Sequence, residues 1–147
     1  MKPIYVLNGP NLNRLGKREP EIYGRTTLAE IEVMCREAAA THPLVFRQSN
    51  AEHELIDWIH EAIDEGAGIV INPAGLSFRS IPLLDALKMF PGPIIELHIS
   101  NIHCRDEIYQ RSLISQAATA VIAGLGADGY PLAVQAMVRR IQDGPAG

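Results

Sequence analysis

The sequence predicts a three-layer, doubly wound α/β sandwich around a five-stranded parallel sheet. Short, nearly continuous apolar runs rich in β-branched residues recur along the chain, as strands that are buried on both faces require. Helical patterns separate these runs, and this alternation is typical of the flavodoxin-like strand order. The runs expected to form strands are 3–8, 44–48, 68–72, 93–100 and 119–123. Because no linker or repeat interrupts the alternation, we expect residues 1–147 to form a single domain.

Signals for helix ends accompany the helical patterns. Thr27 followed by Glu30 forms a capping box at the start of the first helix. Gly66 is suited to end the second helix, and Pro131 is suited to the first turn of the last one. The five helices are expected from residue 28 onward and over 55–63, 81–88, 105–117 and 131–142, with a frayed tail over 143–147.

Composition excludes several classes of protein. The chain has 147 residues, enough for a real core, and its net charge of −4 argues against a nucleic-acid-binding surface but not against a small anionic ligand. Its apolar stretches are far shorter than the roughly 20 residues of a membrane span, and no signal-peptide pattern is present. Cys35 and Cys104 are isolated, which favours free thiols. We therefore expect a cytoplasmic protein with no membrane or nucleic-acid partner.

The segment 11–23 follows the first expected strand and is the most informative part of the chain. Loops at the ends of buried strands often carry binding and catalytic groups. Nearby positive charge favours the ionised form of a tyrosine, so the tyrosine of this segment is a candidate base. The segment combines an amide, three cations and a tyrosine: Asn11, Arg14, Lys17, Arg18 and Tyr23.

Polar side chains also follow the other expected strands, where ligands bind in doubly wound sheets. Glu96, His98 and Ser100 are spaced by two, so their side chains should leave one face of the fourth strand. A carboxylate beside an imidazole fixes its tautomer and favours a proton donor. Two alternatives are a purely structural Glu–His pair and a metal site that adds His103 and Cys104, although close metal-ligand spacing is missing.

In order along the chain, these motifs resemble the type II 3-dehydroquinate dehydratase family. The resemblance covers nearly the whole chain and agrees with the fold predicted from periodicity. The matching segments are Gly9-Pro10-Asn11-Leu12-Asn13, Leu15-Gly16, Arg18-Glu19-Pro20, Ile22-Tyr23-Gly24, Gln48-Ser49-Asn50, Asn72-Pro73, Asp85-Ala86, 96–101, His103, Arg105-Asp106, Ser112, Gly124-x-Gly126 and Gly129-Tyr130.

The resemblance implies loss of water from a cyclohexanone carboxylate by anti elimination through an enolate. Tyr23 would remove the proton next to the ketone, and Arg18 and Arg105 would stabilise its phenolate. His98, oriented by Glu96, would protonate the leaving hydroxyl. The reaction would need neither a metal nor an organic cofactor.

The resemblance also implies how the substrate is held. Asn11 would hold a water or the enolate oxygen. Asn72, Ser100 and the backbone N–H groups of Ile99 and Ser100 would bind the carboxylate and the departing oxygen. The segment 18–23 would close as a lid, and Asp85 would reach the site of a neighbouring subunit. Members of this family usually assemble as a homo-dodecamer built from trimers.

Two positions depart from the family pattern. Where the family has a substrate-binding histidine this chain has Phe78, and where it has a substrate-binding arginine this chain has Tyr109. Both lost groups normally contact ring hydroxyls remote from the carboxylate; Phe78 has no donor or acceptor and Tyr109 has one neutral hydroxyl. Arg79 and Arg111 are candidates to compensate.

Three hypotheses therefore remain open. The first is a 3-dehydroquinate dehydratase with an altered hydroxyl-recognition pocket. The second is a lyase of the same chemistry that acts on a related cyclic ketoacid in which the ring hydroxyls are missing or changed. The third is a non-catalytic paralogue that binds a carboxylate.

Overall fold

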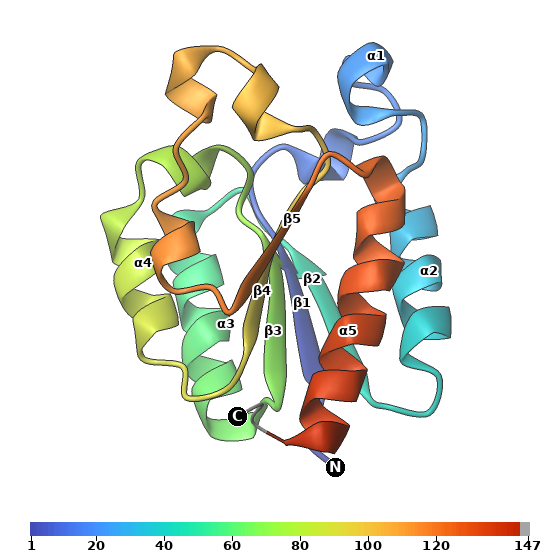
Figure 1. Ribbon diagram of the computed structural model, residues 1–147, viewed down its shortest axis with the longest axis vertical. Helices are drawn as coiled ribbons and strands as arrows, with labels where there is room; N and C mark the ends of the chain where they lie inside the picture. Colours follow the sequence, from blue (N-terminus) through green and yellow to red (C-terminus); the bar gives the residue numbers. More distant parts are fainter. Residues whose placement is uncertain (145–147) are drawn as a thin grey trace.

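The computed structural model describes residues 1–144 and confirms the doubly wound α/β sandwich (Figure 1). All neighbouring strands are parallel, and their order, β2-β1-β3-β4-β5, is the flavodoxin-like one. The predicted strand positions hold to within two residues at every end. The strands are β1 (Ile4–Asn8), β2 (Leu44–Gln48), β3 (Gly68–Asn72), β4 (Ile94–His98) and β5 (Ala120–Ala123).

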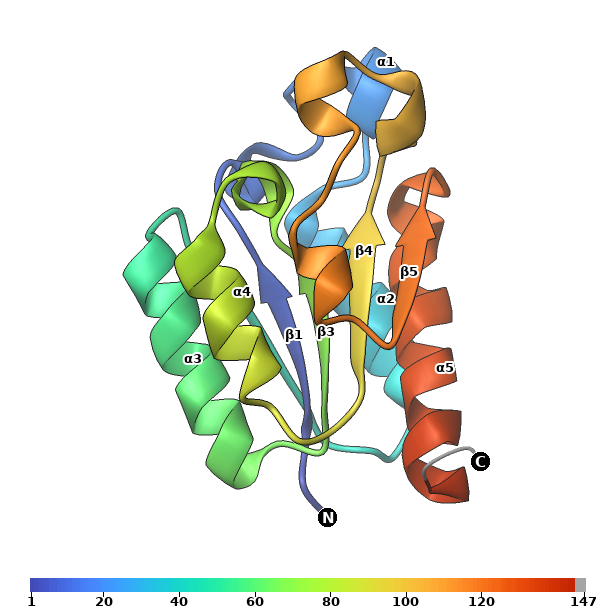
Figure 2. The ribbon, with the colours of Figure 1, turned by 60° about the vertical axis from the view of Figure 1, so that its left-hand side comes forward.

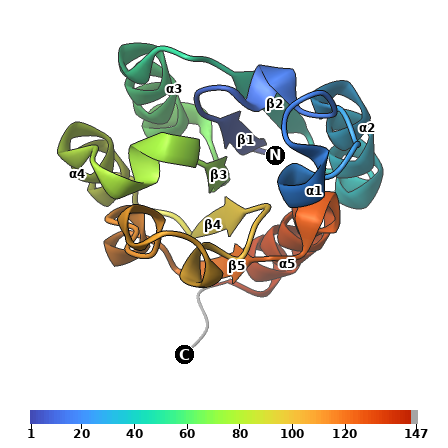
Figure 3. The same cartoon turned by 90° about the horizontal axis from the view of Figure 1, so that it is seen from above.

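Two pairs of helices cover the two faces of the sheet. Helix α2 (Leu28–Ala39) packs beside α5 (Gly129–Asp143) on one face. Helix α3 (Glu52–Glu65) packs beside α4 (Ile81–Lys88) on the other. Figures 2 and 3 show the sheet enclosed between the two pairs. This arrangement buries both sides of the inner strands, which explains why their sequences read as continuous apolar runs.

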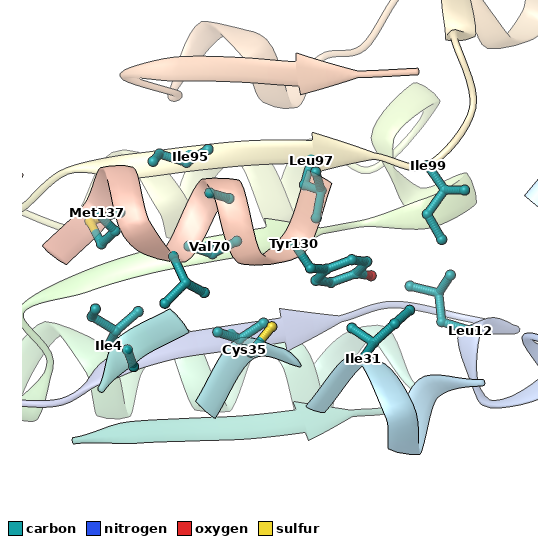
Figure 4. Packing of buried hydrophobic residues seen from close by; sticks show 14 of the residues in the cluster. Ile4, Leu12, Ile31, Cys35, Val70, Ile95, Leu97, Ile99, Tyr130 and Met137 are labelled. Carbon is teal, nitrogen blue, oxygen red and sulfur yellow. The ribbon is translucent and has the colours of Figure 1, made fainter. Parts of the chain in front are cut away.

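Strand residues alternate strictly between the two cores. In β1, Ile4 and Val6 face α2 and α5, whereas Tyr5 and Leu7 face α3 and α4. Figure 4 shows the first of these cores, with Tyr130 of α5 reaching in among its apolar side chains. Because every second side chain of a strand points to the same face, Asn8 lies on the α2/α5 face after Val6, and Asn72 lies on that face after Val70.

The carboxyl ends of the strands lie at the same edge of the sheet. Asn8 is in register with Gln48 on one side and with Asn72 on the other. Beyond this edge rise the short helix α1 (Pro20–Tyr23) and the segment that follows β4 (Figures 1 and 2). The chain turns closely here: a Cβ atom on Gly9 would lie 2.5 Å from the carbonyl oxygen of Pro73, so only glycine fits.

The prediction of a helix over 105–117 is wrong. The segment instead forms two 3-10 turns, Glu107–Tyr109 and Ile114–Gln116, joined by irregular chain. The N–H of Leu113 donates to the carbonyl of Ser77, at 2.7 Å. A bond to another part of the fold removes that N–H from a helical ladder, so tertiary contacts override the local pattern.

Other predicted details are confirmed. The Thr27–Glu30 capping box is present, and Gly66 lies directly after α3. Helix α5 begins at Gly129, two residues before Pro131. Cys35 is buried and Cys104 exposed, and both are free thiols. The expected frayed tail lies largely outside the described residues, since α5 includes Asp143 and the description ends at 144.

Candidate active site

A cavity of about 200 Å³ opens at the carboxyl edge of the sheet. Its walls come from the loops after β1, β3 and β4 and from α1, which is the position expected for a ligand in this fold. The cavity is lined by Pro10, Asn11, Leu12, Arg18, Tyr23, Asn72, Ala74, Gly75, Phe78, His98, Ile99, Ser100, Ile102, Arg105 and Tyr109.

Tyr23 lies beside two cations at this cavity. The guanidinium carbon of Arg18 is 4.7 Å from the centroid of the Tyr23 ring, and that of Arg105 is 5.6 Å away. Tyr23 is the last residue of α1, whereas Arg105 directly follows a 3-10 turn after β4. Elements distant in sequence therefore place two positive charges next to one phenol.

His98 and Glu96 form the expected pair on one face of β4. The Nε2 atom of His98 hydrogen-bonds Glu96 Oε2, and the hydroxyl of Ser115 donates to Glu96 Oε1 at 2.6 Å. Burial raises the pKa of Glu96, but the hydrogen bonds from His98 and Ser115 outweigh it, so this pKa lies below its usual value. An ionised Glu96 accepts from Nε2 and leaves Nδ1 of His98 for a ligand.

Asn11 has a left-handed backbone (φ 72°), a conformation that asparagine tolerates better than most residues. Its N–H donates to Asn50 Oδ1 at 2.9 Å, and the same oxygen accepts from Gln48 Nε2 at 3.1 Å. Gln48 also donates to the carbonyl of Gly9. The end of β2 thus fixes the turn that presents Asn11 to the cavity.

Asn72 is held from behind by a buried chain of hydrogen bonds. Its Nδ2 donates to the hydroxyl of Tyr130 (2.9 Å), which donates to Asn8 Oδ1 (2.7 Å). Asn8 Nδ2 donates to the carbonyl of Arg47, and Asn72 Oδ1 accepts from the N–H of Ala74. A backbone carbonyl ends the chain on one side and a backbone N–H on the other, so the orientation of both amides is determined.

The two departures from the family pattern touch each other. The rings of Phe78 and Tyr109 meet edge to face, with centroids 5.5 Å apart and an interplanar angle of 78°. The guanidinium carbon of Arg105 lies 4.2 Å from the centroid of Tyr109. Arg79 and Arg111, the candidates to compensate, line a neighbouring hollow that shares Phe78 with the cavity.

The structure brings together nearly all the predicted site residues. Glu96 lies behind His98 rather than on the wall, and Asp85 is exposed on α4, away from this cavity. Sequence reasoning missed the roles of Ser115, which lies in the segment wrongly expected to be helical, and of Tyr130, which reads as an ordinary core residue. Within residues 1–144, His, Cys, Asp and Glu side chains form no group of three able to hold a metal ion. No helix in that range is long and apolar enough to cross a membrane.

Comparison with known proteins gives consistent relatives. The chain is 55% identical over 140 residues to 3-dehydroquinate dehydratase 2 of Agrobacterium fabrum, covering 94% of this chain and 95% of that one. It is 58% identical over 134 residues to 3-dehydroquinate dehydratase of Methylobacterium radiotolerans, covering 90% of each. The crystal structure of type II dehydroquinase from Propionibacterium acnes superimposes with a TM-score of 0.91 at 43% identity, covering 95% of this chain and 97% of that one.

The family assignment rests on the whole length of the fold. The model of the family described as dehydroquinase class II matches residues 2–138, from two residues before β1 to within α5. Together with the geometry of the cavity, this match shows that the chain belongs to the class II dehydroquinase family.

Proposed function

We propose that this chain is a 3-dehydroquinate dehydratase, a carbon–oxygen lyase that removes water through an enolate. The observation that carries the proposal is the placement of Tyr23 beside Arg18 and Arg105 in the same cavity as His98. A dehydration of this kind needs a base and an acid in one site, and these residues supply both.

Tyr23 acts as the base that removes the proton next to the ketone. Its phenolic oxygen is the proton acceptor, and the guanidinium groups of Arg18 and Arg105 lie against its ring, where they place positive charge beside the group that receives the proton. Asn11, whose backbone is fixed by Asn50, holds a water or the enolate oxygen that develops as the proton leaves. The segment 18–23 closes over the bound substrate and excludes water.

His98 acts as the acid that protonates the leaving hydroxyl. Its Nε2 is engaged by the carboxylate of Glu96, so Nδ1 is the nitrogen available to the substrate. Ser115 holds the second oxygen of Glu96 and so keeps the carboxylate in place. Glu96 therefore positions the acid without contacting the substrate.

The substrate carboxylate binds where β3 and β4 end. Asn72 and Ser100 line the cavity there, as does Ile99, whose backbone N–H can donate to an anion. Because Tyr130 and Ala74 fix the amide of Asn72, this group meets the substrate already oriented.

The assembly and compartment are also part of the proposal. We propose a homo-dodecamer of single-domain subunits built from trimers, in which the exposed Asp85 of α4 reaches a neighbouring subunit's site. The free thiols of Cys35 and Cys104 support a reducing compartment, the cytoplasm. Size-exclusion chromatography with light scattering measures the assembly, and a monomer would contradict it.

Formation of the conjugated enone, followed by ultraviolet absorbance with 3-dehydroquinate, tests the activity. We expect the natural chain to turn over the substrate and Tyr23→Phe to lower kcat by at least about 10²-fold, the usual contribution of a general base. Tyr5→Phe is the matched control, because Tyr5 lies on the α3/α4 side of β1, outside the cavity. No turnover by the natural chain would exclude the proposed reaction, and normal turnover by Tyr23→Phe would exclude the proposed base.

A further inference from the structure

Phe78 and Tyr109 form one continuous surface of the cavity, which we call the aromatic wall. Phe78 ends the 3-10 turn after β3, and Tyr109 ends one of the turns after β4. Their edge-to-face contact at 5.5 Å is a favourable aromatic geometry. The two residues are thus one packed unit, and each fixes the ring of the other.

The aromatic wall has little capacity for hydrogen bonding. Phe78 has no donor or acceptor, and Tyr109 has one neutral hydroxyl. The guanidinium carbon of Arg105 lies 4.2 Å from the centroid of the Tyr109 ring, and it also lies near Tyr23. Ala74 lines the cavity next to this surface and adds only a methyl side chain.

The groups that can bind polar atoms come from other parts of the lining. Asn11 follows β1, Asn72 ends β3, and His98 ends β4 with Ser100 just beyond it. These groups match the parts of the substrate that react or carry charge: the ketone, the carboxylate and the leaving hydroxyl. The two remaining ring hydroxyls of 3-dehydroquinate take no part in the elimination.

We infer that the aromatic wall makes the site indifferent to those two ring hydroxyls, so that its substrate class is 1-hydroxy-3-oxocyclohexane carboxylates with or without them. This inference rests on the proposed function. A site built to hydrogen-bond a substrate hydroxyl rejects the analogue that lacks it by about 10⁴–10⁵-fold, whereas an apolar surface discriminates by about 10²-fold or less.

The chemistry is the same for every member of this class. A C–H bond beside the ketone breaks and its proton passes to Tyr23, while the electron pair forms the enolate. The enolate then expels the hydroxyl, which leaves as water with a proton from His98. The proton on Tyr23 returns to solvent and His98 regains one, so the products are one enone and one water.

The test compares 3-dehydroquinate with 1-hydroxy-3-oxocyclohexane-1-carboxylate, which keeps every reacting group and lacks the other two hydroxyls. Both reactions yield a conjugated enone and are followed by ultraviolet absorbance. We expect the natural chain to have kcat/KM values for the two compounds within about 10²-fold of each other. Phe78→Leu keeps the surface apolar and should leave the ratio of the two values unchanged. Phe78→His adds a donor and should raise the ratio in favour of 3-dehydroquinate by at least about tenfold.

Three results would count against the inference, and they can be told apart. A preference of the natural chain for 3-dehydroquinate by about 10³-fold or more would overturn the inference while leaving the proposed function intact. Turnover of neither compound would overturn the proposed function and the inference with it. An unchanged ratio in Phe78→His, with circular dichroism matching that of the natural chain, would also overturn the role of the aromatic wall.

Discussion

Replacing Tyr130 by phenylalanine removes the hydroxyl that joins Asn8 to Asn72 inside the α2/α5 core. Tyr130 is fully buried, and burial raises its pKa, so the hydroxyl is protonated throughout the neutral range and donates to Asn8. Phenylalanine has the same ring and fits the same space. The change therefore tests the hydrogen bonds and leaves the apolar packing in place.

The expected loss of stability follows from the burial of Asn8 and Asn72, the two hydrogen-bond partners of the Tyr130 hydroxyl. Asn8 and Asn72 are 0% and 3% exposed, so neither can turn to solvent for a replacement. Each buried polar atom left unpaired costs about 1–3 kcal/mol, and partial relaxation gives an expected loss of about 2–4 kcal/mol in the free energy of unfolding. Because Asn72 would then present its amide less rigidly, KM should rise more than kcat falls.

The assay is urea unfolding followed by the fluorescence of Trp58 and by circular dichroism. Tyr5→Phe is the matched control: Tyr5 donates to Glu61 at 2.6 Å, but Glu61 is 37% exposed and keeps its ion pair with Arg47. Water can replace that hydroxyl, so we expect a loss of only about 0.5–1.5 kcal/mol. A loss in Tyr130→Phe no larger than in Tyr5→Phe, with KM unchanged, would refute the reasoning.

Three further predictions concern pH, backbone strain and thiol reactivity. The lowered pKa of buried Glu96 stabilises the fold above the ordinary glutamate pKa of about 4.3, and this stability is lost as pH falls through the pKa of the folded protein. The urea midpoint of Glu96→Gln should therefore depend less on pH between about pH 5 and 3 than that of the natural chain. The same pH dependence of the midpoint in both proteins would contradict this. Ala40 directly follows α2 with φ 54° and ψ −114°, a conformation that is strained for alanine and accessible to glycine, so Ala40→Gly should raise the free energy of unfolding by about 1 kcal/mol. A lower stability of this variant in urea unfolding would count against the prediction. Cys104 should react with a chromogenic disulfide reagent in the native state, whereas Cys35, whose pKa burial raises to about 12, should react only after unfolding; equal native rates would disagree with the structure.

The sheet could be predicted because its signal is local. Residues 69–71 are buried between the two helix layers, so their side chains had to be apolar wherever the strand lay in the order. The segment 105–117 could not be predicted in this way. Its conformation depends on the bond between Leu113 and Ser77, and no periodic pattern within the segment records that partner.

In the site, too, local features could be predicted from the sequence, whereas contacts between distant segments could not. Arg18 and Tyr23 share one short segment, so their proximity was visible in the sequence, and the two-residue spacing of Glu96 and His98 predicted their pairing. The approach of Arg105 to Tyr23 came only from the family resemblance. The contact of Phe78 with Tyr109 was not foreseen, because it joins two turns whose separation only the folded chain determines.

The division of labour between Tyr23 and His98 can be tested most directly by deuterium exchange. Proton NMR of 3-dehydroquinate in heavy water follows loss of the proton that lies between the ketone and the leaving hydroxyl. With His98→Asn, the enolate should still form and reverse, so we expect exchange at this position with little enone. With Tyr23→Phe, neither exchange nor enone should appear. Rapid exchange in Tyr23→Phe, or its complete absence in a folded His98→Asn, would contradict separate roles for the base and the acid.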